Sequence, residues 1–274
     1  MRGLIRHFLL TLVLNQRNPQ ALVFGYLVPV FFLIAFGSVF GSTGPELQRS
    51  LGKVLTIAAL GGGCFGLPIT LVAERERGVW RRYRLSPLGG GRLLLSTLLA
   101  RLVILLSSGA LVVLAAVLIY GMPWPAHPLA TVLGYSAACL AFSGIGLLLA
   151  MLANSVGAVQ AMGQCLFLPM LIIGGVAVPL QMLPEWAQTF SRFTPGRYAV
   201  AAIDHAVLPQ LAFSDAWFAL LALLLCGLCG TLAALRALRW DNEPLPPAAT
   251  VTAVGVMLGF WIVIGVIAGS GGLP

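Results

Sequence analysis

The longest uncharged stretch of the chain constrains its fold more than any other sequence feature. From Leu102 to Pro184 the sequence contains no Asp, Glu, Lys or Arg. An α-helix needs about 20 apolar residues to cross a bilayer, and a charge at the bilayer centre costs at least about 2.5–3.5 kcal/mol. The stretch therefore predicts three consecutive membrane spans with short turns between them, near Leu93–Tyr120, Leu129–Ala153 and Val159–Val178.

Other apolar runs, each between charged residues, predict four further spans. They are Ala21–Gly41, Val54–Ala73, Ala216–Leu235 and Val251–Ala268. The chain is 59% hydrophobic and only 9% charged, whereas soluble domains carry roughly 25% charged residues. We therefore expect an all-α integral membrane protein of six spans, with a seventh span after the proline-rich linker Arg236–Pro247.

The basic residues predict the orientation of the spans. Of the sixteen, only Arg49, Lys53, Arg192 and Arg197 fall on one side, and the other twelve fall on the opposite side. The positive-inside rule then places the N-terminus in the cytoplasm of a cell with the chain in its inner (plasma) membrane. This topology explains the net charge of +8 without nucleic-acid binding. Arg101 is expected near the inner end of the third span, where its side chain can reach the headgroups.

Two segments outside the spans have amphipathic helical patterns. Arginines and apolar residues alternate before Pro19, which predicts an N-terminal helix lying in the membrane interface. On the outer side, Pro179–Leu211 places Trp186, Phe190 and Phe193 on one helical face, followed by a second short helix over Tyr198–Val207. This outer segment is interpreted either as a structured cap on the fifth span or as a gate.

Small residues recur at helical spacing within the spans. Gly62 and Gly66 fit the small-xxx-small pattern that lets helices approach closely. Cys226-Gly-Leu-Cys229 has the form of a CxxC motif, but it lies among leucines in the middle of a predicted span. We interpret it as small-residue packing and expect no metal or redox site there.

The segment Glu74–Pro87, after the second span, holds five arginines, two glutamates and two large aromatic residues. One interpretation is an anchor that fixes orientation, with Trp80 and Tyr83 at the headgroups. The other is a short cytoplasmic helix that docks into a partner, because aromatic residues and arginines are enriched at binding hot spots. Pro87 and the glycines that follow would end this helix and return the chain to the membrane.

Several functional classes lack their usual residues in this chain. A phosphate-binding loop needs Gly-x-x-x-x-Gly-Lys-[Ser/Thr], but the single lysine, Lys53, lies in Leu51-Gly52-Lys53-Val54. The spans lack the acidic and histidine residues that ion-coupled transporters use, and no nucleophile–base or zinc motif occurs. We expect no catalytic residue, cofactor or metal on this chain, so energy from ATP would have to come from another polypeptide.

The Glu74–Pro87 segment resembles the coupling-helix region of the type 2 ATP-binding-cassette (ABC-2) exporter permeases. In that family a Glu-x-Glu-x-Gly motif ends the second span, and a short helix and a Ser/Thr-Pro turn follow. Here these elements are Glu74-Arg75-Glu76-Arg77-Gly78, then Val79–Leu85, then Ser86-Pro87. The order of the elements over residues 1–240 is also similar. The chain departs from the family in Val79-Trp80-Arg81-Arg82, which replaces a Thr-Leu-Glu/Lys-type continuation, and in its seventh span.

The resemblance implies a permease domain over residues 1–240, with residues 241–274 forming a linker and an additional helix. Two such chains, identical or paralogous, would enclose a path for an apolar or amphipathic cargo such as a drug, antibiotic, lipid or glycolipid. Separate nucleotide-binding subunits, which carry ATP and Mg, would dock on the coupling helix. The residues expected at that contact are Glu74, Glu76, Gly78, Val79, Trp80, Arg81, Arg82, Tyr83, Arg84 and Leu85.

Within that set, Val79, Trp80, Tyr83 and Leu85 are the expected apolar contacts, and the arginines form the expected polar rim. Two other functions stay open from the sequence. One is a membrane assembly or sensor subunit that recruits a cytoplasmic partner through the same loop without transporting anything. The other is a secondary transporter.

Overall fold

The structure is a computed structural model that describes residues 2–17, 22–39, 44–85, 89–240 and 246–270. Every regular element within these ranges is helical. In chain order they are α1 (Arg2–Arg17), η1 (Val23–Leu27), α3 (Val28–Val39), α4 (Gly44–Gly61), η2 (Gly62–Gly66), α5 (Leu67–Glu76), α6 (Val79–Arg84), α7 (Gly90–Tyr120), α8 (Pro128–Leu152), α9 (Val156–Ile172), η3 (Leu180–Met182), α10 (Glu185–Ser191), α11 (Pro195–Val207), η4 (Phe213–Ala216), α12 (Trp217–Arg236) and α13 (Pro247–Ser270).

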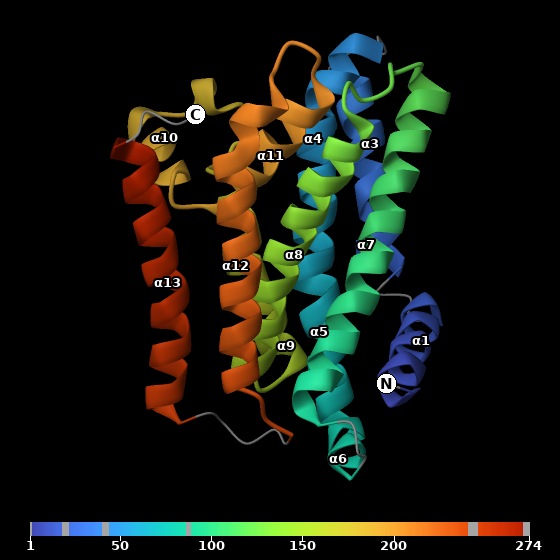
Figure 1. Cartoon of the computed structure of the whole chain (residues 1–274), viewed down its shortest axis with the longest axis vertical. Coiled ribbons are helices and arrows are strands. Elements are labelled where there is room, and N and C mark those ends of the chain that lie inside the picture. Colours follow the sequence, from blue (N-terminus) through green and yellow to red (C-terminus); the bar gives the residue numbers. More distant parts are fainter. Residues whose placement is uncertain (1, 18–21, 40–43, 86–88, 241–245, 271–274) are drawn as a thin grey trace.

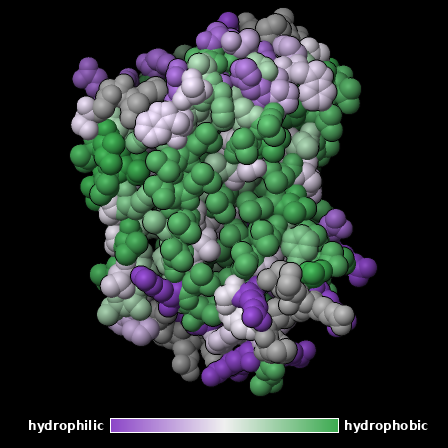
Figure 2. All heavy atoms as spheres, viewed as in Figure 1, coloured by the Kyte–Doolittle hydropathy of each residue, from purple (hydrophilic) through white to green (hydrophobic). Residues whose placement is uncertain are grey.

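The long helices stand side by side as one bundle (Figure 1). In the described ranges five segments are long and apolar enough to cross a membrane, and two further apolar helices, Gly25–Ser38 and Val156–Ile172, are shorter. The surface in Figure 2 shows a broad apolar belt between two more polar ends. The expected all-α membrane architecture is therefore confirmed.

The second span forms the centre of the bundle. Its segment Leu47–Glu76 joins α4, η2 and α5 into one helix, and nearly all of it is buried by α3, α7, α8, α9 and α11. Next to it, α8 packs closely on α12. A Cβ at Gly144 would lie 2.5 Å from the carbonyl oxygen of Gly227, so the two backbones are in direct contact.

Prolines explain why the first two spans contain π-helical turns. In the second span Pro68 lies two residues after the end of η2, and in the first span Pro29 lies two residues after the end of η1. A proline cannot donate to the carbonyl four residues earlier, and its ring clashes with that carbonyl. The wider π-helical turn relieves this clash without ending the helix.

Arg101 corrects one expectation from the sequence. It lies eleven residues into α7 and is 1% exposed, because its side chain points into the bundle and does not reach the headgroups. Its Nε donates to the carbonyl oxygen of Gly62 at 2.9 Å, and its Nη2 donates to the same atom at 2.5 Å. That carbonyl also accepts the backbone N–H of Leu67. An arginine of α7 thus holds the π-helical turn of the second span.

The fifth span ends earlier than its apolar sequence predicts. The helix α9 ends at Ile172, six residues before the expected end, and Gly175 turns the chain with φ +74°. Only a glycine adopts this conformation readily. The chain then forms η3 and the two short helices α10 and α11, which cover the same end of the bundle (Figure 1).

The seventh helix, α13, packs on α12 and on these short helices. The ring of Trp261 stacks on Tyr198 of α11 at a centroid distance of 5.7 Å. A Cβ at Gly265 would overlap the ring of Phe193, which follows α10. The sequence assigned no role to this helix, and the structure shows that it supports α10 and α11 from one side.

The N-terminal helix α1 packs along α7 with its polar side inward. His7, Thr11 and Asn15 are buried, whereas Ile5 and Leu9 are about half exposed. The imidazole Nδ1 of His7 lies 2.7 Å from the Ser96 hydroxyl of α7, and burial lowers the pKa of His7. The apolar side of α1 therefore faces outward, where lipid would cover it, and its buried polar side chains bond to the bundle.

Candidate coupling site

A glycine turn positions the short helix α6 at one end of the bundle. The second span ends at Glu76, and Gly78 turns the chain with φ +71°, a conformation that L side chains rarely adopt. Six residues, Val79–Arg84, then form α6 beyond the end of the spans (Figure 1). The sharp turn from the second span to the short helix thus explains the glycine of the Glu-x-Glu-x-Gly motif.

Trp80 is buried within the protein and is not exposed on the outward side of α6, and its expected contact with a partner stays a prediction. Its side chain is fully buried, and its indole N–H donates to Glu74 Oε2 at 3.3 Å. The ring lies edge-on to Trp240 at 6.3 Å, and the guanidinium of Arg75 lies 5.9 Å from its centroid. Trp80 therefore fastens α6 to the foot of the second span and to the segment after α12.

Tyr83 fastens the same helix to α1. Its ring lies edge-on to the imidazole of His7 with a centroid distance of 5.2 Å, and it is half-buried. Burial raises the pKa of the Tyr83 phenol, and the nearby Glu74 raises it further. The sequence pattern predicted that Tyr83 lies on the side of α6 that faces a partner, but α1 covers part of that side.

The outward side of α6 is basic. Arg81, Arg82 and Arg84 are exposed, and Leu85 directly after the helix is 89% exposed. Val79 is partly buried. Of the ten residues expected at a partner contact, these five present the accessible surface of the helix, together with the exposed Glu76 just before the turn. Their contact with a partner stays a prediction.

Both glutamates of the motif have partners within the chain. Glu74 accepts the Trp80 N–H, and Glu76 Oε1 accepts the backbone N–H of Val156 at 2.9 Å. Val156 is the first residue of α9, so the Glu76 carboxylate meets the positive end of that helix. The Ser155 hydroxyl caps the same end by accepting the N–H of Ala158 at 3.1 Å.

Two arginines from distant parts of the chain meet at the loop between α8 and α9. Arg75 and Arg239 both donate to the carbonyl oxygen of Ala153. Burial lowers the pKa of Arg239. Nothing in the sequence connects Arg239 or Trp240 with α6. In the sequence these two residues form a basic and aromatic pair directly after a span, and such pairs occur at many membrane interfaces.

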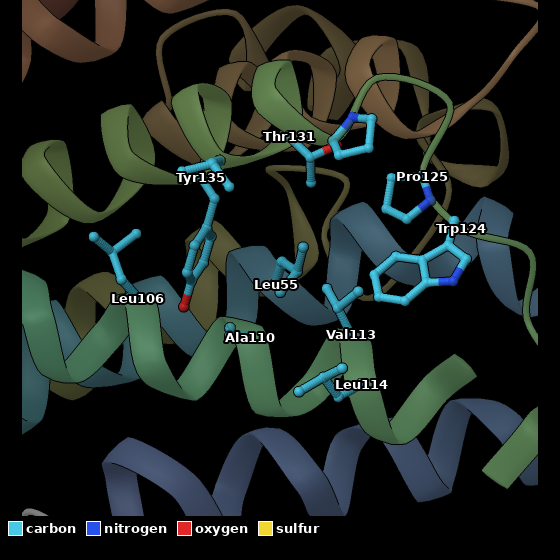
Figure 3. A pocket seen from close by; sticks show the side chains of 12 residues that line it. Leu55, Leu106, Ala110, Val113, Leu114, Trp124, Pro125, Thr131 and Tyr135 are labelled. Carbon is cyan, nitrogen blue, oxygen red and sulfur yellow. The ribbon is translucent and has the colours of Figure 1, made fainter. Parts of the chain in front are cut away.

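An apolar cavity of about 340 Å³ lies at the opposite end of the bundle. It is enclosed by α4, α7, α8 and the loop that holds Trp124 and Pro125 (Figure 3). Its two hydroxyls are already used, because Tyr135 donates to Leu105 O at 3.0 Å and Thr131 to His127 O at 3.1 Å. The cavity therefore offers an occupant mainly apolar contacts, with the indole of Trp124 at its wall.

The described residues contain no group of three or more His, Cys, Asp or Glu that could hold a metal ion.

The model of the family described as ABC-2 type transporter matches residues 8–208. The chain belongs to the ABC-2 type transporters. An ABC-2 permease is the membrane component of a transporter and is not itself catalytic. A comparison with curated proteins gave no match.

The range that matches the ABC-2 family includes α6. It also includes Glu74 of α5, which bonds to Trp80 of α6, and the bond from Glu76 to the start of α9, whereas His7, the partner of Tyr83, lies one residue before it. It ends before α12, so Arg239, Trp240 and α13 lie outside it. The attachment of α6 to the segment after α12 is thus a feature of this chain that the matched range does not contain.

Proposed function

We propose that the chain is the permease subunit of an ATP-driven exporter and that a separate nucleotide-binding subunit docks on α6. One observation carries the proposal. The helix α6 presents Arg81, Arg82, Arg84 and Leu85 outward, while its other side is bound to three parts of the bundle. A partner that moves this helix would act on the bundle directly.

The contacts of α6 suggest two routes for such a movement. One runs through Trp80 and Glu74 into α5, and from there to the π-helical turn that Arg101 holds. The other runs through Glu76 to the first residue of α9. Helices move as rigid elements, so a displacement at one end is carried along the span. In this proposal ATP and Mg bind to the partner subunit, and two permease chains form the path.

The proposed cargo is an apolar or amphipathic molecule, such as a drug, antibiotic, lipid or glycolipid, moved from the cytoplasm or inner leaflet. The cavity of Figure 3 supports this class, because its lining is mainly apolar and the Thr131 and Tyr135 hydroxyls both donate to backbone carbonyls. The proposed location is the inner (plasma) membrane with α1 and α6 on the cytoplasmic side, which agrees with the positive-inside rule.

The test is reconstitution of the chain in proteoliposomes with candidate ABC ATPase subunits from the same genome. We expect one of them to bind and to show permease-dependent ATP hydrolysis. Arg82→Glu should weaken that binding at least tenfold, because a negative charge replaces the positive charge of a hot-spot arginine. Arg92→Glu, an exposed arginine in the first turn of α7, is the matched control and should bind like the wild type.

Glu76→Gln separates docking from transmission. It keeps the shape of the side chain but weakens the bond to Val156, so the ATPase subunit should still bind while transport per ATP falls. Binding of an ATPase subunit without transport of any cargo class would favour the alternative of an assembly or sensor subunit. Unchanged binding in Arg82→Glu and Arg81→Glu would contradict the proposed docking surface.

A further inference from the structure

The cavity between α12 and α13 lies at the end of the bundle that carries Arg236. It has a volume of about 440 Å³, more than ten times the ~30 Å³ that one water occupies in the liquid. Its lining consists mainly of small and apolar side chains, namely Cys229, Leu232, Ala233, Arg236, Ala237, Ala249, Thr252, Ala253 and Val256. Four of these nine residues are alanines, which are too small to fill the space between the helices.

The contacts of α13 explain why the cavity lies at this end. Toward its C-terminal end α13 is held by the stacking of Trp261 on Tyr198 and by the packing of Gly265 on Phe193. Nearer its start, α13 lines the cavity with Ala249 and Ala253, and α12 lines it with Ala233 and Ala237. The helices α12 and α13 run side by side (Figure 1), and the cavity lies between them at the Arg236 end.

The surroundings of the cavity indicate what fills it. Both helices are membrane-crossing segments, and Leu232 and Val256 at the cavity are about half exposed. In a bilayer these side chains face acyl chains. An apolar cavity that stayed empty would forfeit dispersion contacts on all its walls, so an acyl chain is the natural occupant.

Arg236 makes one end of the cavity positively charged. Arg236, in the last turn of α12, is exposed and is the only charged residue among the described lining residues. The Thr252 hydroxyl already donates to carbonyls of its own helix, at 2.8 and 3.0 Å. A guanidinium at the end of an apolar cavity complements a phosphate attached to an acyl chain, because arginine binds phosphate oxygens through two parallel bonds.

We propose that this cavity binds one phospholipid with an anionic headgroup, with an acyl chain between α12 and α13 and the phosphate on Arg236. The lipid supplies the contact between the two helices that the alanines leave open. The proposal does not depend on the transport function. It identifies the leaflet on the Arg236 side as the source of the lipid.

The test is native mass spectrometry of the full chain, released from nanodiscs that contain equal amounts of phosphatidylglycerol and phosphatidylcholine. We expect the wild type to retain phosphatidylglycerol preferentially. Arg236→Gln should lower this preference about fivefold, the effect of one basic residue at an anionic surface. The matched control Arg92→Gln, an exposed arginine in α7, should keep the preference.

A second pair of variants tests the acyl-chain site. Ala249→Phe fills the cavity and should reduce the retention of both lipids, whereas Ala248→Phe, an exposed neighbour outside the cavity, should not. Thermal unfolding of each variant checks that the bundle is intact. Three results would overturn the proposal. They are equal preference for phosphatidylglycerol in the two arginine variants, equal lipid retention in the two alanine variants, and displacement of phosphatidylglycerol by millimolar inorganic phosphate. A second copy of the chain in place of lipid would also overturn it, because Ala249→Phe would then change the oligomeric state and leave the lipid count unchanged.

Discussion

A guanidinium lies inside the bundle at Arg101, and glycines make room for it. A Cβ added at Gly66 would overlap Nη2 of Arg101, whereas a Cβ at Gly61 would meet no atom within 4 Å. Nη1 of Arg101 is buried without a hydrogen-bond partner within the chain. A buried charge tolerates little displacement, because its bonds to the Gly62 carbonyl replace the water that it has lost.

These two glycines give a matched pair of variants. Gly66→Ala should destabilise the protein by about 1–3 kcal/mol, since the added methyl forces Arg101 away from its acceptor. Gly61→Ala should be neutral or stabilising by up to ~1 kcal/mol, because alanine favours the helix and meets no neighbour. Unfolding in detergent micelles measures both, and equal losses in the two variants would contradict the role given to Arg101.

Asp204 makes stability depend on pH. Its Oδ1 is buried without a hydrogen-bond partner, and burial raises its pKa to about 7 although Lys53 opposes the shift. An unfolded aspartate has a pKa near ~3.9, so the folded state binds more protons between about pH 4 and 7. Stability should therefore fall as the pH rises through this range.

The measurement is the melting temperature of Asp204→Asn against the wild type. The variant should be more stable at pH 8, and the difference should disappear below about pH 3, where the wild-type carboxyl is protonated in both states. Asp215→Asn, at an exposed aspartate beside α12, is the control and should show no such trend. A difference for Asp204→Asn that is the same at both pH values would rule out the mechanism.

At the scale of elements, α8 and α12 are in close contact through glycines. Gly144 lies against Gly227 and Gly230, and an added Cβ at any of the three would come too close to the backbone of the neighbouring helix. Membrane helices gain no hydrophobic driving force from association in lipid, so close backbone contact supplies much of their attraction. This interface also positions the start of α9, because α8 and α9 are joined by three residues.

A substitution at this interface should therefore separate the two helices. Gly144→Ala is expected to cost about 1–3 kcal/mol, since backbone atoms cannot rotate away as a side chain can. Gly157→Ala, in the first turn of α9, meets no atom within 4 Å and serves as the control. Unfolding in micelles compares the two, and an unaffected Gly144→Ala variant would mean that the helices can move apart at little cost.

Some of these elements could be read from the sequence, and others could not. Uncharged length predicted the spans because a buried charge is costly, and Glu-x-Glu-x-Gly predicted the turn before α6. The depth of Arg101 was misjudged because glycines three or four positions apart predict a close helix contact but not which side chain enters the space. The inward side of α1 was missed because polar residues are assumed to face water, while here they bond to the bundle. The burial of Trp80 was not predicted because its partners Glu74 and Trp240 are brought together only by the tertiary fold.

At the scale of the whole molecule, α13 supports the end of the bundle that α10 and α11 cover. Trp261 is 7% exposed and contacts Tyr198 and Phe260. Tyr198 in turn packs on Phe218 of α12 and donates to the carbonyl oxygen of Arg192 at 2.6 Å. One aromatic group thus links α11, α12 and α13, so a change in α13 should reach the short helices.

Trp261→Ala tests this link. Removing a buried tryptophan costs about 3–5 kcal/mol at a core position, and the loss should appear here as local loosening of α10 and α11. In nanodiscs, trypsin should cleave at Arg192 and Arg197 several-fold faster than in the wild type. Leu258→Ala, at a 59% exposed position of the same helix, is the control and should leave the rate unchanged. Equal rates in both variants would show that α13 is not a support.

The π-helical turn at Gly62–Gly66 has a consequence for how this chain can change in length. A π-helical turn holds one residue more than an α-helical turn. The α-helical parts of the second span on either side of it each keep their own packing. A deletion of one residue elsewhere in the second span would rotate everything beyond it by about 100°, since an α-helix has 3.6 residues per turn. A deletion of one glycine here would convert the turn to ordinary α-helix and leave both halves in register. The glycine run is thus the position in the second span where evolution could add or remove a single residue without rebuilding the bundle.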